Sequence, residues 1–271
     1  MKRHILLSIL LPALLLCSCA ERTPRFVIIH FNDTHSHLDP LRSGEYAGGG
    51  GVIERAAFVD SVRVAEGENR VLLLHAGDWD QGTTYYSEMG GKLEVALINA
   101  LRYDCLTLGN HEFDDGIESL TERVRDINAP VVCANLDLSS FELGNYVKPY
   151  TVINKGGVKI GIVGLICDLS SVVSKTSSAR IPQEDPVPAL NRYAKILREQ
   201  EACTFVIALT HVGYDEDKEY AAQSLGVDLF VGGHSHTFTD GIVYVENPEG
   251  KKVGIVTDGC WGLQAGLAKI Y

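Results

Sequence analysis

Short apolar runs alternate with segments of helical periodicity over much of this chain, and this alternation constrains the fold more than any other feature. The run FVIIHF at 26–31 precedes a helical pattern over 52–66, in which apolar residues recur on one face. The run VLLLHAG at 71–77 precedes the helical segment KLEVALINAL at 92–101 in the same way. Repeated pairs of strand and helix predict an α/β fold.

Later regions of the chain add strands without helices between them. The segment 150–166 reads as two strands joined by a tight hairpin at 155–157, where glycines permit the turn. The residues from 241 onward are expected to form a β meander with a turn at 247–250. No internal repeat or long linker divides the chain. We therefore expect 26–271 to form one domain, with mixed sheets in layers and helices outside.

The amino terminus has the layout of a secretory signal. Lys2 and Arg3 precede the apolar run 5–16, which ends in small residues. This run is too short to span comfortably a bilayer whose hydrocarbon core is about 30 Å thick. The residues just ahead of Cys19 read LCS and resemble the lipobox of bacterial lipoproteins. We therefore predict that Cys19 carries a lipid, and the alternative is a plain secreted protein.

This interpretation divides the chain and sets its charge. We expect a lipoprotein signal peptide at 1–18 and a lipidated tether at 19–25, with the protein anchored in the cell envelope on the periplasmic side or at the cell surface. Loss of the signal removes two cations and lowers the net charge from −11 to −13. Such a surface repels nucleic acid and anionic lipid, so we expect no nucleic-acid partner and no membrane contact beyond the anchor. An anionic substrate would need a local source of positive charge, such as metal ions.

Five further cysteines sit in or beside apolar runs. They are Cys105, Cys133, Cys167, Cys203 and Cys260. Free cysteine is often a small buried hydrophobe, and no pair has CxxC spacing. We expect packing residues, with one disulfide as the alternative in an exported protein.

Polar residues recur where the predicted strands stop. In α/β sheets, loops at the carboxyl ends of the strands converge on one crevice and form the site there. A single polar residue at such a position is commonly a turn former, but five strand ends rich in His and Asp exceed what turns require. The five groups are Asn32 to His35, Asp78, Asn110 with His111, His211, and His234 to His236.

These side chains favour a site for divalent metal ions. Carboxylate, imidazole and amide oxygen suit Zn²⁺, Mn²⁺ or Fe ions, and no thiolate is involved. In Asp33-x-His35 and in His234-x-His236, alternate residues point the same way if the chain is locally extended, so each pair could supply two ligands. Asp78 could bridge two ions because a carboxylate has two oxygens.

Seven sequence blocks resemble the calcineurin-like metallophosphoesterases, and specifically their bacterial 5′-nucleotidase branch. The blocks are NDTHSHL, AGDWDQG, YDCLTLGNHEFDDG, CANLDL, IGIVGL, LTHVGYDEDKEYA and VDLFVGGHSHT. They cover almost all of 26–271 in the family's order. The resemblance implies that 26–271 is a metallophosphoesterase catalytic domain, a four-layer α/β/β/α sandwich with mixed sheets and a metal site at the carboxyl ends of its strands.

The resemblance also implies a ligand set for two metal ions. One ion would be held by Asp33, His35 and His236. The other ion would be held by Asn110, His211 and His234. Asp78 would bridge them.

The same resemblance places His111 beside the phosphate, with Asp114 as its partner. Residues three apart share a face if a helix begins there, and a carboxylate raises a histidine's pKa and orients its ring. Protonated His111 could then stabilise charge on the phosphoryl oxygens or on the leaving group. We expect Glu112 and Asp115 to be solvated charges, and other histidines nearby to be packing or loop surface, namely His30, His37 and His75.

The sequence thus predicts a phosphohydrolase of nucleotide catabolism, in which a water shared by two metal ions attacks phosphorus in line. Nucleoside 5′-monophosphates are the expected substrates, as for a 5′-nucleotidase. A second hypothesis is a hydrolase that cleaves nucleotide sugars or cyclic nucleotides. The non-enzymatic alternative is a metal-binding scaffold lipoprotein. Family 5′-nucleotidases continue into a second, nucleotide-binding domain beyond the place where this chain ends. We therefore expect either a broader substrate range or a separately encoded substrate-binding partner.

Overall fold

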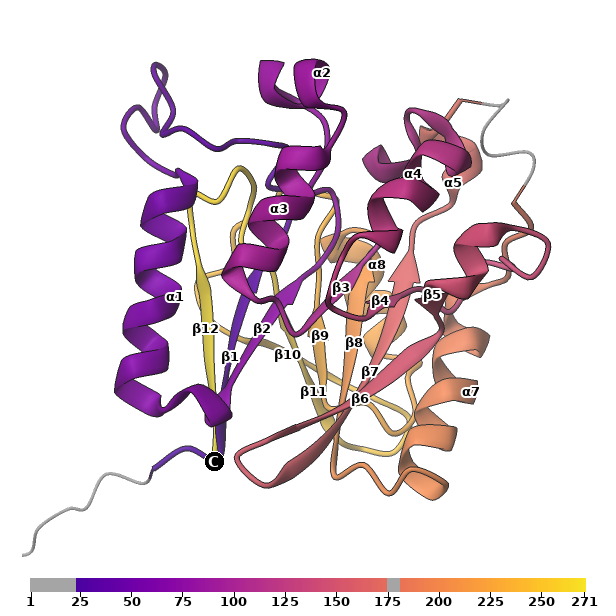
Figure 1. Cartoon of the computed structure of the whole chain (residues 1–271). Coiled ribbons are helices and arrows are strands. Elements are labelled where there is room, and N and C mark those ends of the chain that lie inside the picture. The colour runs from indigo at the N-terminus through magenta and orange to yellow at the C-terminus, as the bar shows by residue number, and fades with distance from the viewer. Residues whose placement is uncertain (1–22, 175–180) are drawn as a thin grey trace, which may run out of the picture.

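The computed structural model describes residues 23–174 and 181–271, so the predicted signal peptide and Cys19 lie outside the described residues. Within them, twelve strands form two six-stranded sheets that lie face to face (Figure 1). In the first sheet the order is β12 (Gly266–Ile270), β1 (Phe26–Phe31), β2 (Val71–His75), β3 (Cys105–Thr107), β4 (Val131–Val132) and β5 (Val147–Lys148). In the second the order is β10 (Val243–Glu246), β11 (Lys252–Val256), β9 (Leu229–Val231), β8 (Phe205–His211), β7 (Val158–Ile166) and β6 (Tyr150–Lys155).

Helices cover the outer faces of both sheets (Figure 1). The first half of the chain contributes α1 (Val52–Glu66), α2 (Thr84–Met89), α3 (Lys92–Leu101) and α4 (Gly116–Arg125). The second half contributes α5 (Leu169–Val172), α7 (Pro186–Glu199) and α8 (Tyr214–Ala221). Single 3₁₀ turns are η1 (Glu68–Arg70), η2 (His111–Phe113) and η3 (Glu142–Asn145).

Three hydrophobic cores separate four layers, as the resemblance implied. Along β1, Val27 and Ile29 pack toward the helices while Phe26 and Ile28 pack into the core between the sheets. A third core fills the space between β7, β8 and the helices α7 and α8. Successive side chains of a strand point to opposite faces, so a strand buried on both faces must be apolar throughout. This is why FVIIHF is apolar apart from His30, which is buried against Asp258.

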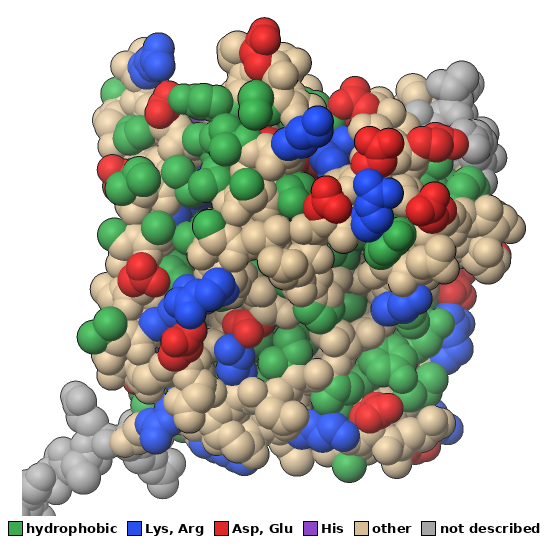
Figure 2. All heavy atoms as spheres, viewed as in Figure 1, with side chains coloured by type: hydrophobic (Ala, Val, Ile, Leu, Met, Phe, Trp, Pro, Cys, Tyr) green, Lys and Arg blue, Asp and Glu red, His purple; other side chains and the backbone are tan. Residues whose placement is uncertain are grey.

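The outer helices bury one side and expose the other. On α4, Leu120 and Val124 are buried, and acidic and basic side chains lie side by side over this helix at the surface (Figure 2). On α1, Val59 is fully buried whereas Val64 is 86% exposed. Among the described residues, no helix combines the length and the apolar character needed to cross a membrane.

The hairpin predicted at 155–157 is present, but the meander predicted at the carboxyl terminus is wrong. Strands β6 and β7 pair antiparallel around two glycines of positive φ. The predicted turn does join β10 to β11, but β11 pairs parallel with β9, and the chain then crosses to the first sheet, where β12 pairs antiparallel with β1. Residue alternation indicates a strand without indicating its partner, so the pattern could not reveal this crossover.

The five cysteines of the described chain are free and buried, which agrees with their predicted role as packing residues. The carboxyl ends of the parallel strands lie at the top in Figure 1, where α2 and the loop before α1 stand above the sheets. This edge carries the polar residues that the sequence singles out.

Candidate metal centre

The strand ends of both sheets meet and bring the predicted ligands together. Asp33 and His35 follow β1, Asp78 follows β2, and Asn110 follows β3; His211 ends β8, and His234 and His236 follow β9. The ligand atoms form three groups, and within each group they lie within 4.8 Å of one another. The groups are Asp33, His35 and His236; His35, Asp78 and His111; and Asp78, His211 and His234. Asp78 belongs to two of these groups, which is consistent with the predicted bridging role.

The first group is centred on two histidines whose ring nitrogens face each other. His35 Nε2 and His236 Nε2 are 3.0 Å apart. His236 Nε2 also lies 3.3 Å from Asp33 Oδ1, and His35 Nε2 lies 3.8 Å from Asp78 Oδ2. Hydrogen bonding to Asp33 raises the pKa of His236 to about 10, and burial lowers the pKa of His35. Nitrogen and carboxylate oxygen atoms converging on one point fit a cation.

The second group contains two acceptor atoms in contact. His211 Nδ1 donates to the carbonyl of Ala76 at 2.7 Å, so Nε2 carries the lone pair in the neutral ring. That Nε2 faces Asp78 Oδ2 at 3.0 Å. Two acceptors this close require a cation between them. Burial lowers the pKa of His211, but Asp78 and Asp33 outweigh it and raise the pKa to about 10, so either a proton or a metal ion would meet this requirement.

Asn110 lies beside this second group with an unused oxygen. Its Oδ1 is buried and has no hydrogen-bond partner among the described residues. A buried acceptor without a partner costs free energy unless something else satisfies it. A divalent ion held by Asn110, His211 and His234 would do so, and the residues present therefore fit the two metal ions that the resemblance implies.

The backbone around the ligands is held in an uncommon conformation. Five of the predicted ligands have positive φ angles between 45° and 80°: Asp33, His35, Asp78, His234 and His236. This left-handed region disfavours residues with a Cβ, and it persists where surrounding contacts enforce it. Here the loops after β1 and β2 pair with each other, because the amide of Asp33 donates to Gly77 O and that of His35 to Asp78 O, both at 3.0 Å.

Glu112 is one residue for which the sequence prediction was wrong. We expected a solvated charge, but its side chain is fully buried. Its carboxylate accepts hydrogen bonds from the amides of Asp78 (3.0 Å), Trp79 (2.9 Å), Asp80 (3.1 Å) and Gly109 (2.6 Å). Glu112 therefore joins the loop after β2 to the loop after β3. Its place in GNHEFDDG gave no signal of this, because three of the four donors come from a segment about thirty residues earlier.

His111 and Asp114 form the predicted pair. His111 begins the single turn η2, and its Nδ1 lies 2.7 Å from Asp114 Oδ2. This hydrogen bond raises the pKa of His111, against the effect of partial burial. The backbone amide of His111 donates to Asp78 Oδ1 at 2.9 Å, and its ring centroid is 5.2 Å from that of His35. His111 is thus tied to the ligand cluster while one-third of its side chain stays exposed.

The other polar residues near the site behave mostly as expected. His30 and His75 are buried, and His75 lies 3.1 Å from the Thr34 hydroxyl. Burial lowers the pKa of His75 to about 3, so the ring is neutral. Asp115 is exposed and accepts a hydrogen bond from Tyr86. His37 lies in the loop after β1 and stacks on Trp261, with ring centroids 5.1 Å apart.

Comparison with known proteins indicates the same family as the sequence motifs. A family model described as calcineurin-like phosphoesterase matches residues 26–238. The 5′-nucleotidase of Homo sapiens is 37% identical over 237 residues, which are 83% of this chain and 40% of that protein. The snake venom 5′-nucleotidase of Naja atra is 34% identical over 235 residues, which are 83% of this chain and 43% of that protein. The chain therefore spans less than half the length of these relatives.

Solved structures show the same relationship. A 5′-nucleotidase precursor from Thermus thermophilus superposes with a TM-score of 0.82 at 35% identity, covering 89% of this chain and 50% of that one. The NAD nucleotidase of Haemophilus influenzae superposes with a TM-score of 0.79 at 29% identity, covering 89% of this chain and 52% of that one. Since the family model matches most of the sequence, the chain belongs to the calcineurin-like phosphoesterase family, whose members use a dinuclear divalent metal site.

Proposed function

We propose that this protein is a metal-dependent phosphohydrolase that cleaves phosphate monoesters, with nucleoside 5′-monophosphates as its substrates. The observation that carries the proposal is the convergence of ligand atoms from five strand ends, with Asp78 shared between two groups. Relatives described as 5′-nucleotidases support the choice of substrate. A turn-forming role alone would not bring these atoms within contact distance of one another.

Within this proposal, Asp33, His35 and His236 would hold one divalent ion. Asn110, His211 and His234 would hold the other, and Asp78 would be shared between them. Zn²⁺, Mn²⁺ and Fe ions suit this donor set. When bound, the two ions neutralise phosphate charge and lower the pKa of a water molecule so that it can act as a nucleophile. The protein's own part is to hold seven ligand side chains in place, and Glu112 braces the two loops that carry Asp78 and Asn110.

His111 has a separate task, which is to hold a proton next to the phosphate. Asp114 accepts a hydrogen bond from Nδ1, which fixes the ring and leaves Nε2 to face away from the carboxylate. A proton at Nε2 can be donated to a phosphoryl oxygen or to the leaving oxygen. Asn110 and His111 are adjacent in sequence but have different roles. Asn110 is a metal ligand, and His111 is a proton donor.

The test is phosphate release by the mature chain from AMP, a nucleotide sugar and a simple aryl phosphate, each with Mn²⁺ and with a chelator. We expect metal-dependent release from AMP, together with a metal content near two ions per chain. Release from the aryl phosphate alone would show intact chemistry without nucleotide recognition. A chain that binds metal but hydrolyses none of the three would support the scaffold alternative and overturn the proposal.

Cleavage of a phosphodiester or pyrophosphate bond is the second candidate. It is favoured by the fold match to a protein described as an NAD nucleotidase, and the same metal chemistry serves either reaction. In the assay above, release of nucleoside monophosphate from the nucleotide sugar, with AMP left intact, would select this candidate.

We also propose that the protein is anchored in the cell envelope through a lipid on Cys19. The support is the sequence LCS ahead of this cysteine and the apolar run before it. Metabolic labelling with a fatty acid should mark the wild-type protein and leave Cys19→Ala unlabelled. Equal labelling of both proteins would place the lipid elsewhere, and labelling of neither would indicate a plain secreted protein.

A further inference from the structure

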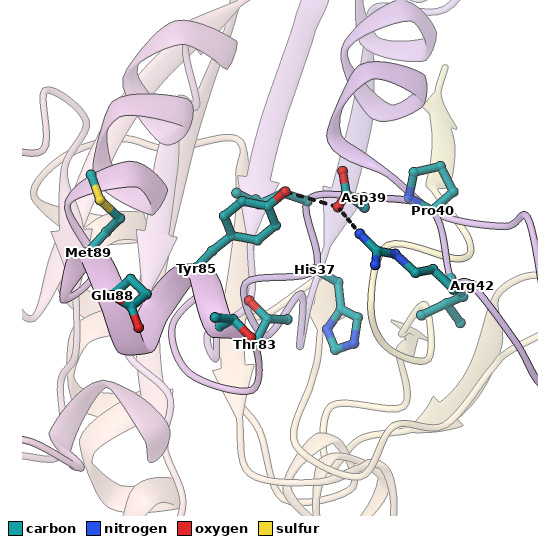
Figure 3. Close-up of a pocket in the computed structure, with 11 residues that line it drawn as sticks. His37, Asp39, Pro40, Arg42, Thr83, Tyr85, Glu88 and Met89 are labelled. Carbon is teal, nitrogen blue, oxygen red and sulfur yellow. Dashed lines mark hydrogen bonds and ion pairs between the residues drawn. The ribbon is translucent and has the colours of Figure 1, made fainter.

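The loop after β1 has two parts with different surroundings. Its later part, residues 37–42, forms one wall of a pocket of about 590 Å³, and residues of α2 line the other (Figure 3). Tyr85 donates to Asp39 across this pocket at 2.9 Å, but none of the lining residues is a predicted ligand. The earlier part, residues 32–36, is buried and carries Asp33 and His35. The contacts that fix these two ligands are therefore those of the buried part.

A further strand end lies beside Asp33, in addition to the five that the sequence analysis identified. Strand β11 pairs parallel with β9, so its carboxyl end reaches the same edge of the sheet, where loops converge on the site. We call residues 258–261 the loop after β11. It lies beyond residue 238, where the family match ends, and the predicted meander gave no reason to assign it to the site.

The loop after β11 is hydrogen-bonded through its backbone to two of the loops that carry ligands. The amide of Trp261 donates to the carbonyl of Asp33 at 2.7 Å, and the amide of Gly259 donates to the carbonyl of Thr237 at 2.9 Å. Gly259 has a φ of 67°, which glycine adopts without strain. Thr237 directly follows His236 in sequence. The loop after β11 thus joins the segments that supply Asp33 and His236.

Asn32 connects the same loop to the carboxylate of Asp33. Its Nδ2 donates to Asp33 Oδ2 at 2.7 Å and to the carbonyl of Gly259 at 2.6 Å. Its Oδ1 accepts a hydrogen bond from the amide of Asp258 at 2.9 Å. Both amino hydrogens and the oxygen of this buried side chain are therefore used. Rotating the amide by half a turn would place its oxygen against two acceptors, so one orientation is fixed.

These contacts give the two oxygens of Asp33 different surroundings. Oδ2 accepts from Asn32 and from the amide of His234, which is closer to Oδ2 (2.9 Å) than to Oδ1 (3.2 Å). Oδ1 lies 3.3 Å from His236 Nε2 and 3.8 Å from His35 Nε2. The oxygen that faces the other two predicted ligands of this ion is thus the one that Asn32 leaves free. Hydrogen bonds to a ligating carboxylate orient it in this way.

A buried pair of side chains supports Asp258. Its Oδ2 lies 2.5 Å from His30 Nδ1, and the two side chains are 3% and 2% exposed. His30 lies on β1, two residues before Asn32. The pair therefore fixes the start of the loop after β11 against β1 and keeps the amide of Asp258 within reach of Asn32. The sequence analysis expected His30 to be a packing or surface residue, and this contact gives it a more specific part.

We propose that Asn32 is a positioning residue of the metal centre, which holds Asp33 with Oδ1 toward the ion and is itself held by the loop after β11. The inference rests on the proposed ligand set and extends it to residues that do not touch the ion. A chain without the Asn32 side chain keeps all seven proposed ligands but binds the ion assigned to Asp33 more weakly.

The first experiment titrates the metal-free mature chain with Mn²⁺ by calorimetry. Asn32→Ala should raise the dissociation constant of one of the two ions by about 10- to 100-fold, the usual effect of losing a residue that orients a ligand. Asn247→Ala is the matched control. Asn247 is 5% exposed, donates to the carbonyl of Ser224 and accepts two backbone hydrogen bonds at the opposite end of β11. Its variant should bind both ions as the wild type does.

The metal dependence of turnover distinguishes positioning from catalysis. Because all seven proposed ligands remain, turnover of AMP by Asn32→Ala should recover as the Mn²⁺ concentration rises. The Mn²⁺ concentration for half-maximal turnover should shift by the same factor as the dissociation constant. Turnover that stays low when both ions are bound would contradict the positioning role.

Asp258 provides a second test, which remains available if Asn32→Ala does not fold. Asp258→Ala removes the partner of His30 and should raise the same dissociation constant by about tenfold. Asp258→Asn keeps an acceptor for His30 and should bind Mn²⁺ nearly as the wild type does. In the double variant with Asn32→Ala the losses should be less than additive, because both changes act through one contact. Fully additive losses would show that Asp258 does not act through Asn32.

The outcomes separate this inference from the proposed function. If the wild type hydrolyses AMP and Asn32→Ala binds both ions with wild-type affinity, the positioning role is wrong and the hydrolase proposal stands. If the wild type binds two ions but hydrolyses no substrate, and Asn32→Ala loses affinity for one ion, the positioning role stands and the proposed hydrolysis fails. A wild type that binds no ion would overturn both.

Discussion

The site has two regions that differ in how tightly they are held. We call Asp33, Asp78, Glu112 and His211 the floor, and Asp39, Tyr85 and Met89 the rim. The side chains of the floor are at most 3% exposed, and hydrogen bonds between neighbouring loops fix their backbones. The rim is between 38% and 50% exposed, and within it the Tyr85 hydroxyl donates to Asp39. The floor is therefore held much more tightly than the rim.

The physical reason for this difference is the cost of buried charge. Carboxylates out of water must be compensated by nearby cations or hydrogen-bond donors, so each floor residue constrains several others. The rim residues are solvated and carry no such requirement. Substitutions in the floor should therefore change turnover and metal content much more than substitutions in the rim.

The strongest test of the floor is Asp78→Asn, which removes one negative charge without changing the shape of the side chain. Because the charge stabilisation supplied by a metal ion amounts to several kcal/mol, turnover should fall by roughly 10⁴-fold. The metal content, measured by mass spectrometry, should fall below two ions per chain. Asp126→Asn, an exposed acid at the end of α4, serves as the control. Retention of both metal ions with full turnover would rule out a bridging role.

His111→Ala should separate proton donation from metal binding. The loss of a positioned proton donor should lower kcat by about a hundred- to a thousandfold. The metal content should stay near two ions per chain, because His111 is not assigned as a ligand. A variant with wild-type turnover would show that the assigned role is wrong, and a variant that loses metal would make His111 a ligand, as its place near His35 and Asp78 allows.

Glu112→Gln should weaken the floor without touching the substrate. A carboxamide has one acceptor oxygen and would turn its amino group toward backbone donors. We expect a loss of about 2–3 kcal/mol in the free energy of unfolding, and about a tenfold loss of turnover because the Asp78 loop shifts. Denaturant unfolding and steady-state kinetics measure the two effects. Glu122→Gln, an exposed glutamate on α4, should show neither effect, and a wild-type result for Glu112→Gln would contradict its anchoring role.

Asp217 gives a different kind of effect, a pH dependence of stability beneath the floor. It accepts a hydrogen bond from Thr210 at 2.7 Å, and burial raises its pKa to about 8. In the unfolded chain the pKa is near 4, so the folded state binds the proton more tightly. The free energy of unfolding should therefore fall as the pH rises from about 4 to about 8.

The measurement compares unfolding curves of Asp217→Asn and of Asp215→Asn across this pH range. Asp217→Asn should flatten the dependence, because the amide does not ionise. Asp215 lies on the same helix but is 84% exposed, so its variant should follow the wild type. Parallel curves for all three proteins would show that Asp217 does not ionise in this range.

Local signals in the sequence were enough to predict much of the site. Strand ends were recognisable from apolar runs such as VLLLHAG, and the spacing of His111 and Asp114 predicted their contact. Burial of Glu112 was not predictable, because its four donors come from the loops after two different strands. The crossover of β12 to β1 could not be predicted for the same reason. Pairing between strands so far apart in sequence does not appear in the local pattern of apolar residues.

The sequence by itself determined the chemistry, that is, which imidazoles, carboxylates and amides stand at strand ends and in what order. It also determined the α/β alternation, because the period of apolar residues is set by the geometry of each element. Only the tertiary structure decided that Asp78 lies between two ligand groups, that Glu112 is buried beneath them, and that Tyr85 faces Asp39 across a pocket. These relations depend on contacts between residues distant in sequence, whose free energies are settled by packing of the whole chain.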